Sequence, residues 1–204
     1  MKLELLLGAA LCFAAFAWLG WLTGRSAPTR LDVEASAMRG QLTVLAVTFT
    51  RLGRWYGVTF VAAFAATIGA RTGKATAILA LFVLQLFVQF AVNGLKIAYG
   101  RPRPDQWLHR LEVGSSYPSG HAATAIVFFG GLLLYSIRAI DDVPRAILPL
   151  VIAALAACVI GLPWARVALG AHYATDVIGG LLFGTGCLCT YVALAPRGLV
   201  PLSG

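Results

Sequence analysis

Charged side chains are scarce in this sequence, which excludes an ordinary soluble domain. Only 12% of the 204 residues are Asp, Glu, Lys or Arg, and 59% are apolar, whereas soluble chains carry about 25% charged residues. Sixteen Lys and Arg outnumber eight Asp and Glu, but no run of five basic residues occurs. Nucleic-acid-binding domains concentrate basic residues on a soluble face. We therefore expect an integral membrane protein without a nucleic-acid partner.

Cysteine is also rare, and its placement indicates neither redox nor metal chemistry. All four cysteines lie inside apolar blocks, at Cys12, Cys158, Cys187 and Cys189. Cys187 and Cys189 are two residues apart on an expected helix, so they point in different directions and match no zinc-ligand spacing. We interpret all four as small buried apolar residues.

Six apolar blocks predict six transmembrane helices, each of which needs about 20 residues. They lie at about Leu3–Leu22, Tyr56–Ala70, Ala75–Tyr99, His121–Ile140, Ala146–Ala165 and Val177–Ala195. The first could be a signal peptide, but Glu4 and the lack of a small-x-small cleavage site favour an uncleaved span. No repeat or second domain is visible, so we predict a single all-α membrane domain over residues 1–204.

The segment between the first two spans has a helical pattern of its own. Its apolar residues recur every three or four positions, at Met38, Leu42, Leu45, Phe49 and Leu52, and Arg39, Arg51 and Arg54 lie off this stripe. This pattern is typical of an amphipathic helix in the membrane interface. A helix packed on the bundle fits the pattern equally well.

Polar residues form three clusters at the ends of these spans. They are Lys96 with Arg103-Pro104, then Pro118-Ser119-Gly120-His121, and finally Arg166 with His172 and Asp176. With six spans, the loop after the third span and the loop after the fifth lie on the same side of the membrane. All three clusters therefore meet on one face, and charge in a membrane-embedded chain usually marks function.

His172 and Asp176 are four residues apart, so they share a face if both lie on a helix. The carboxylate can then accept a hydrogen bond from one imidazole nitrogen, which leaves the other nitrogen free to attack and stabilises the imidazolium. The alternative is an ordinary interfacial histidine beside an aspartate that favours a helix N-terminus.

Ser119 is a candidate N-cap for the fourth span, and the glycine after it lets the backbone approach a ligand closely. A helix start of this kind binds anions, and His121 beside it could protonate a leaving oxygen. A capped helix with a chance histidine would look the same.

Lys96, Arg103 and Arg166 together could hold three phosphoryl oxygens, with Arg as the bidentate partner. Lysine at a span end more often extends to the interface without any further role. The convergence of three cations and two histidines on one side favours a phosphate site.

The three clusters read K-x6-R-P, P-S-G-H and R-x5-H-x3-D, which resembles the signature of the type 2 phosphatidic acid phosphatase superfamily, related to the vanadium haloperoxidases. The motifs cover residues 96–176. One position departs from the family pattern: Ala165 stands where a serine usually precedes the arginine of the third motif. We expect this change to tune activity, because that serine is not the nucleophile.

The resemblance implies that His172 attacks phosphorus, oriented by Asp176, and that His121 protonates the leaving group. Lys96, Arg103, Ser119, Gly120 and Arg166 would bind the phosphoryl oxygens. The carboxylates Asp105, Glu112 and Asp176 are too isolated for a two-metal cluster, so we expect no metal or other cofactor.

We therefore expect a membrane lipid phosphatase acting on phosphatidic acid, phosphatidylglycerol phosphate or polyprenyl diphosphate. A phosphotransferase with the same phosphohistidine is the main alternative, and an anion transporter is disfavoured because transporter sites lie near the midplane. The resemblance implies the plasma (inner) membrane with an outward, periplasmic site, whereas Lys and Arg counts are too even to orient the chain. The oligomeric state is left open.

Overall fold

The computed structural model describes residues 1–24, 26–105, 108, 113–138 and 146–200, and every regular element in these ranges is helical. Five helices are long and apolar enough to cross a bilayer: α1 (Lys2–Thr23), α5 (Ala75–Tyr99), the continuous helix Gly120–Arg138, α8 (Leu148–Ala168) and α9 (Ala174–Leu194). The all-helical membrane bundle that the sequence predicts is therefore confirmed. Ile140, the expected end of the fourth span, lies outside the described residues.

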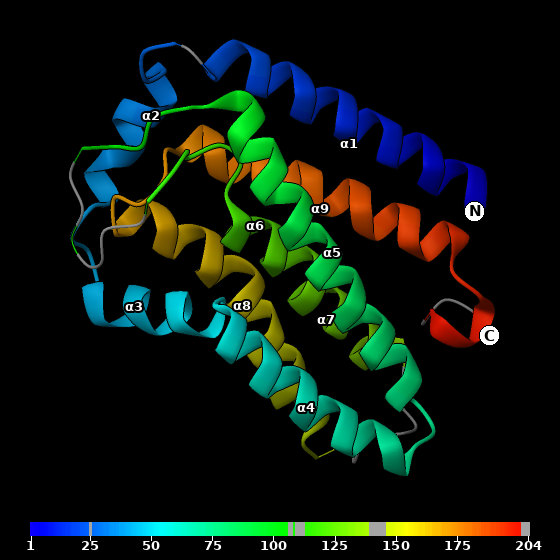
Figure 1. Ribbon diagram of the computed structural model, residues 1–204. Coiled ribbons are helices and arrows are strands. Elements are labelled where there is room, and N and C mark those ends of the chain that lie inside the picture. The colour runs from blue at the N-terminus through cyan, green and yellow to red at the C-terminus, as the bar shows by residue number, and fades with distance from the viewer. Residues whose placement is uncertain (25, 106–107, 109–112, 139–145, 201–204) are drawn as a thin grey trace.

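The second expected span, at about Tyr56–Ala70, corresponds to α4 (Trp55–Arg71), which is the shortest of the helices that match the expected spans. Its 17 residues reach about 25 Å, less than the hydrocarbon thickness of about 30 Å. It packs alongside α5 after a tight turn in which Gly73 has φ +71° (Figure 1). Five of the six expected spans are thus confirmed, and a crossing by α4 remains a prediction.

The segment between α1 and α4 folds into α2 (Arg30–Ala35), a 3₁₀ turn (Ser36–Met38) and α3 (Thr43–Leu52). The expected helix therefore begins at Thr43, because Leu42 adopts a left-handed conformation with φ +47°. Its packed face also differs from the predicted stripe: Ala46 and Thr50 are buried against α8, while Leu42 and Leu45 are exposed. α3 is therefore a helix packed on the bundle, which was the second of the two alternatives. Its location in the membrane interface stays a prediction.

One continuous helix occupies the centre of the bundle. It consists of α6 (Gly120–Thr124), a π-helical stretch η2 (Ala125–Gly130) and α7 (Gly131–Arg138), with α4, α5, α8 and α9 around it (Figure 1). Phe128 of this helix packs with Leu81 of α5 and Leu162 of α8, and none of the three has any exposed surface. A short 3₁₀ turn, Arg197–Leu199, follows α9.

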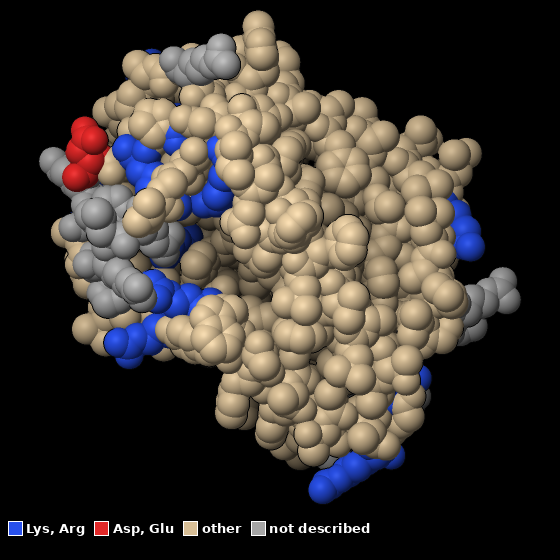
Figure 2. Space-filling view, in the orientation of Figure 1, with Lys and Arg blue, Asp and Glu red and all other residues tan. Residues whose placement is uncertain are grey.

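Apolar side chains cover the outside of the bundle as well as its core. Exposed examples include Leu7 and Trp18 on α1, and Phe60 and Phe87 on α4 and α5, as expected where lipid replaces water as the solvent. On the face drawn in Figure 2, Lys and Arg lie at the margins. Most of them surround a hollow at the end that holds α2 and α3.

Candidate active site

His172 lies in the turn between α8 and α9, at the end of the bundle that holds α2 and α3. Gly170 reverses the chain with φ +69°, and Tyr173 N donates to Asp176 Oδ2 at 2.9 Å as the first turn of α9 begins. His172 thus precedes the helix instead of sharing its face, which corrects the sequence expectation. The turn still places His172 Nδ1 3.5 Å from Asp176 Oδ2, somewhat longer than a formed hydrogen bond.

The other ring nitrogen of His172 faces a cation. Arg103 Nη1 lies 3.3 Å from His172 Nε2 and also donates to Ala171 O at 3.0 Å. Because a guanidinium can only donate, Nε2 must present its lone pair, and the ring proton resides on Nδ1 beside the carboxylate. Arg103 Nε is held by Gly114 O at 2.9 Å.

The surroundings of His172 keep its imidazole neutral. Burial, followed by the positive charges of Lys96, Arg103 and Arg166, holds the pKa of His172 well below the ordinary value of 6.5. Nearby cations and desolvation both disfavour the imidazolium. At neutral pH, Nε2 is therefore available as a nucleophile.

Ser119 and Gly120 begin the central helix next to the start of α9. Ser119 occupies the N-cap position, as predicted, but its side chain makes no capping bond. Its Oγ is buried and has no hydrogen-bond partner among the described residues. Ser119 N donates to Asp176 O at 3.0 Å, while Gln89 of α5 donates to Gly120 O at 3.1 Å. These contacts fix the helix start between α5 and α9.

His121 and Arg166 meet at Thr50 of α3, a residue that sequence reasoning missed. His121 Nε2 lies 3.2 Å from the carbonyl oxygen of Thr50, and Arg166 Nη1 donates to Thr50 Oγ1 at 3.3 Å. A carbonyl only accepts, so His121 Nε2 carries a proton and Nδ1 is the nitrogen left for exchange. The sequence feature that could have indicated Thr50 is a pair of small side chains, Ala46 and Thr50, which lie four positions apart and therefore share a helix face.

Lys96 lies in the last turn of α5, where its Nζ donates to Ser115 O at 3.1 Å. Its ammonium therefore points back to the loop that connects the first two motifs. Ala165, which departs from the family pattern, is fully buried in an apolar cluster with Ala46, Ala168 and Leu169. The position that the family gives to a serine thus packs against α3 in this chain.

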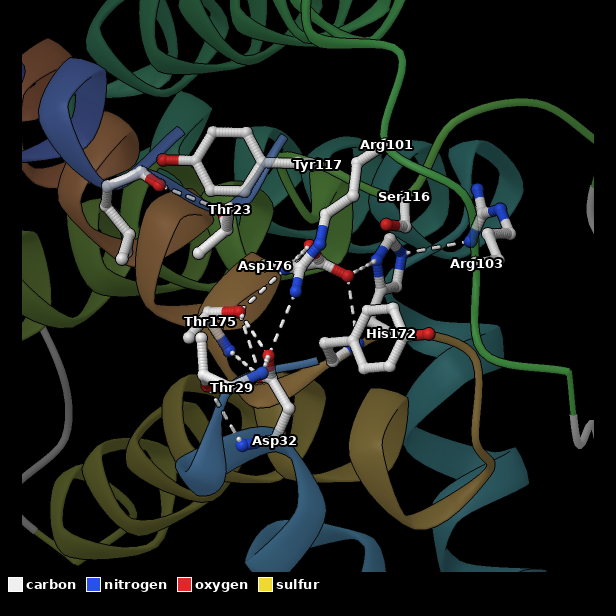
Figure 3. Close-up of polar contacts among 12 residues, drawn as sticks. Thr23, Thr29, Asp32, Arg101, Arg103, Ser116, Tyr117, His172, Thr175 and Asp176 are labelled. Atoms are coloured by element: carbon white, nitrogen blue, oxygen red, sulfur yellow. Dashed lines mark hydrogen bonds and ion pairs between the residues drawn. The ribbon is translucent and has the colours of Figure 1, made fainter. Parts of the chain in front are cut away.

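The fold brings all eight predicted site residues to one end of the bundle. A neutral imidazole, three cations and a helix start together suit nucleophilic attack on a phosphoryl group. Within the described residues, no group of three His, Cys, Asp or Glu side chains lies close enough to hold a metal ion. Figure 3 shows a further layer that the sequence did not indicate, in which Arg101 joins Asp176 to Asp32.

Known proteins resemble this chain in both sequence and fold. Lipid A 1-phosphatases of Rhizobium johnstonii and Rhizobium etli are each 36% identical to it over 132 residues, which is 59% of this chain. The match covers 49% and 51% of those relatives, so the chain spans about half of their length. The crystal structure of a transmembrane PAP2-type phosphatidylglycerolphosphate phosphatase from Bacillus subtilis has a similar fold, with a TM-score of 0.70 at 19% identity. That likeness covers 91% of this chain and 93% of the other.

A family model provides the assignment. The model of the PAP2 superfamily matches residues 74–198, which include all three polar clusters and every predicted site residue. The match begins after α2 and α3, so Asp32 and Thr50 lie outside it. The chain belongs to the PAP2 superfamily.

Proposed function

We propose that this chain is a metal-independent lipid phosphatase that hydrolyses a phosphate monoester or diphosphate of a lipid through a phosphohistidine. The observation that carries the proposal is the orientation of His172. Its lone pair on Nε2 faces Arg103, and its protonated Nδ1 faces Asp176. The imidazole is thus directed at the place where cations would hold a phosphate.

In the first step, His172 Nε2 forms a bond to phosphorus while the bond from phosphorus to the lipid oxygen breaks. Lys96, Arg103 and Arg166 stabilise the charge on the phosphoryl oxygens, with Ser119 and the amide of Gly120 at the helix start. Asp176 stabilises the positive charge that develops on the ring. His121 enters this step as an imidazolium, with Nε2–H toward the Thr50 carbonyl, and gives its Nδ1 proton to the leaving alkoxide, which leaves His121 neutral.

In the second step, water attacks the phosphohistidine. His121 takes the proton from that water, the bond between phosphorus and Nε2 breaks, and inorganic phosphate leaves. His172 is then neutral again. The same intermediate could pass its phosphoryl group to the hydroxyl of another lipid, which is the transferase alternative.

The place of the site at one end of an apolar bundle suits a lipid substrate, because a phosphate head group can enter while its chains stay in lipid. The relatives' names add the 1-phosphate of lipid A to the candidates, beside phosphatidic acid, phosphatidylglycerol phosphate and polyprenyl diphosphate. We propose that the site faces outward from the plasma membrane, as the family resemblance implies.

The test is phosphate release by the purified protein in detergent with EDTA, over these four lipid phosphates. We expect release without added metal, and a loss of about a thousandfold or more in His172→Ala, because the nucleophile is removed. Arg138→Gln, at the far end of α7, is the control. Absence of release from every lipid would contradict the hydrolase, and phosphate transfer to an added lipid alcohol would then favour the transferase.

A further inference from the structure

A buried chain of charges extends from Asp176 away from His172. Arg101, which follows α5 and is 1% exposed, donates from Nη1 to Asp176 Oδ1 at 2.6 Å and from Nη2 to Asp32 Oδ2 at 2.9 Å (Figure 3). Its guanidinium also stacks on the ring of Tyr173, 4.4 Å from the ring centroid. Arg101 occupies an unspecified position of the first motif, and Asp32 belongs to α2, outside the matched region.

Asp32 is held firmly as a carboxylate in this arrangement. It accepts hydrogen bonds from Thr175 N at 2.9 Å and Thr175 Oγ1 at 2.8 Å, and from Thr29 N at 3.0 Å. Burial raises the pKa of Asp32, but these bonds and Arg101 outweigh burial and lower it overall. Asp32 is therefore ionised at neutral pH despite being buried.

The charge of Asp32 affects how strongly Asp176 can stabilise a positive charge on His172. If Arg101 contacted Asp176 alone, the pair would be neutral and would stabilise a positive imidazole only weakly. With Asp32 as a second anion on the same guanidinium, the trio carries one net negative charge. Asp176 Oδ2 then remains directed at His172 Nδ1, while Oδ1 is anchored by Arg101.

We propose that Arg101 and Asp32 are positioning residues for the reaction, through which α2 holds Asp176 in place and preserves its negative charge toward His172. The proposal rests on the proposed function. The alternative is that the ion pairs only hold α2 against α9. Buried ion pairs add little net stability, but removing one partner is strongly destabilising, so the test must separate a loss of activity from a loss of folding.

The test compares Asp32→Asn with Glu34→Gln in phosphate release from the best lipid substrate. Both substitutions remove one negative charge from α2, but Glu34 is exposed and pairs with Arg30 at the surface. For Asp32→Asn we expect kcat to fall about tenfold or more with KM within about twofold, because charge is lost only where the imidazole becomes positive. Glu34→Gln is expected to match the wild type.

A double substitution separates positioning from structure. In an Asp176→Asn background, Asp32→Asn should cause no further loss of kcat, because its effect passes through Asp176. An unchanged kcat in the single variant, an equal loss in both backgrounds, or a loss explained wholly by the unfolded fraction in a thermal melt would overturn the inference. If Asp32→Asn does not fold, Asp32→Glu is measured instead, because it keeps the charge but displaces the carboxylate. A loss of kcat that disappears in the Asp176→Asn background then supports positioning of Asp176, and an unchanged kcat overturns the inference.

The outcomes distinguish the two proposals. A wild type that releases no phosphate from any lipid overturns the proposed function itself. An active wild type with an equally active Asp32→Asn variant overturns only the role of Asp32 and Arg101.

Discussion

The two ring nitrogens of His172 face groups of opposite charge, and this contrast defines the chemistry available at the site. Asp176 lies beside Nδ1, and Arg103 lies beside Nε2. The carboxylate favours the tautomer with a proton on Nδ1. The guanidinium lies on the Nε2 side of the ring, where it could bind the oxygens of a phosphate. In the proposed reaction, His172 thus lies between Asp176, which would stabilise the positive charge on the ring, and Arg103, which would bind the phosphate.

We predict that His172 stays neutral in the free protein well below pH 6.5. Burial and the charges of Lys96, Arg103 and Arg166 all disfavour the imidazolium, so protonation requires a lower pH than in a free histidine. NMR of protein labelled at histidine Cε1, assigned with His172→Ala, would follow this group. A titration midpoint near 6.5 for His172 would contradict the assigned environment.

Lys96→Met sharpens the same measurement. Because the charge of Lys96 is, after burial, the first cause that lowers the pKa of His172, its removal should raise the His172 midpoint. Lys74→Met, the same change at the opposite end of α5, should leave the midpoint where it is in the wild type.

At the scale of elements, close contacts between helices place the start of the central helix. A Cβ at Gly180 of α9 would lie 2.3 Å from the backbone oxygen of Ser119 and 2.9 Å from Ala122 Cβ. Backbone atoms cannot yield easily, so only glycine allows α9 to approach α6 this closely. The position of Ser119 therefore depends on a residue outside the three motifs.

We expect Gly180→Ala to destabilise the protein by about 1–3 kcal/mol, because the added methyl overpacks the contact. It should also lower kcat/KM, because Ser119 is displaced. Gly94→Ala on α5 is the matched control, since a Cβ there meets nothing within 4 Å and alanine is the better helix former. Thermal melts and phosphate release in detergent measure both effects. An unchanged melting temperature in Gly180→Ala would contradict the close packing.

At the scale of the whole molecule, α5 separates two ends of different character. One end holds the candidate site and the gathered cations (Figure 2). The other holds the turn between α4 and α5, beside an apolar pocket of about 320 Å³ lined mainly by α4, α7 and α8. Since α5 is long enough to cross the bilayer, we predict that the two ends face opposite sides of the membrane.

Cysteine labelling would test this topology and the proposed orientation. In a variant without the four native cysteines, Val113→Cys, at a position 95% exposed near the site, should react with a membrane-impermeant thiol reagent on intact spheroplasts. Arg71→Cys, at the end of α4, should react only after permeabilisation. The reverse pattern would place the site inward, and labelling of both positions on intact spheroplasts would contradict a crossing by α5.

The sequence by itself determined the all-helical membrane class and the residues gathered at the site. A long apolar block is stable mainly as a span across a bilayer. Because successive spans run in opposite directions, the order of the spans places Lys96, His121 and His172 on the same side. Local physics was sufficient because each motif lies where a span begins or ends.

Only the tertiary structure decided which residues surround the motifs. Thr50 joins His121 to Arg166, and Asp32 reaches Asp176 through Arg101. The residues in each of these contacts lie 69 to 116 positions apart in the sequence. No local pattern marks such pairs, since a lone Asp or Thr in a polar segment looks the same whether it faces water or a buried guanidinium. Helix packing excludes water around them, and that exclusion gives these ordinary residues their effect on the site.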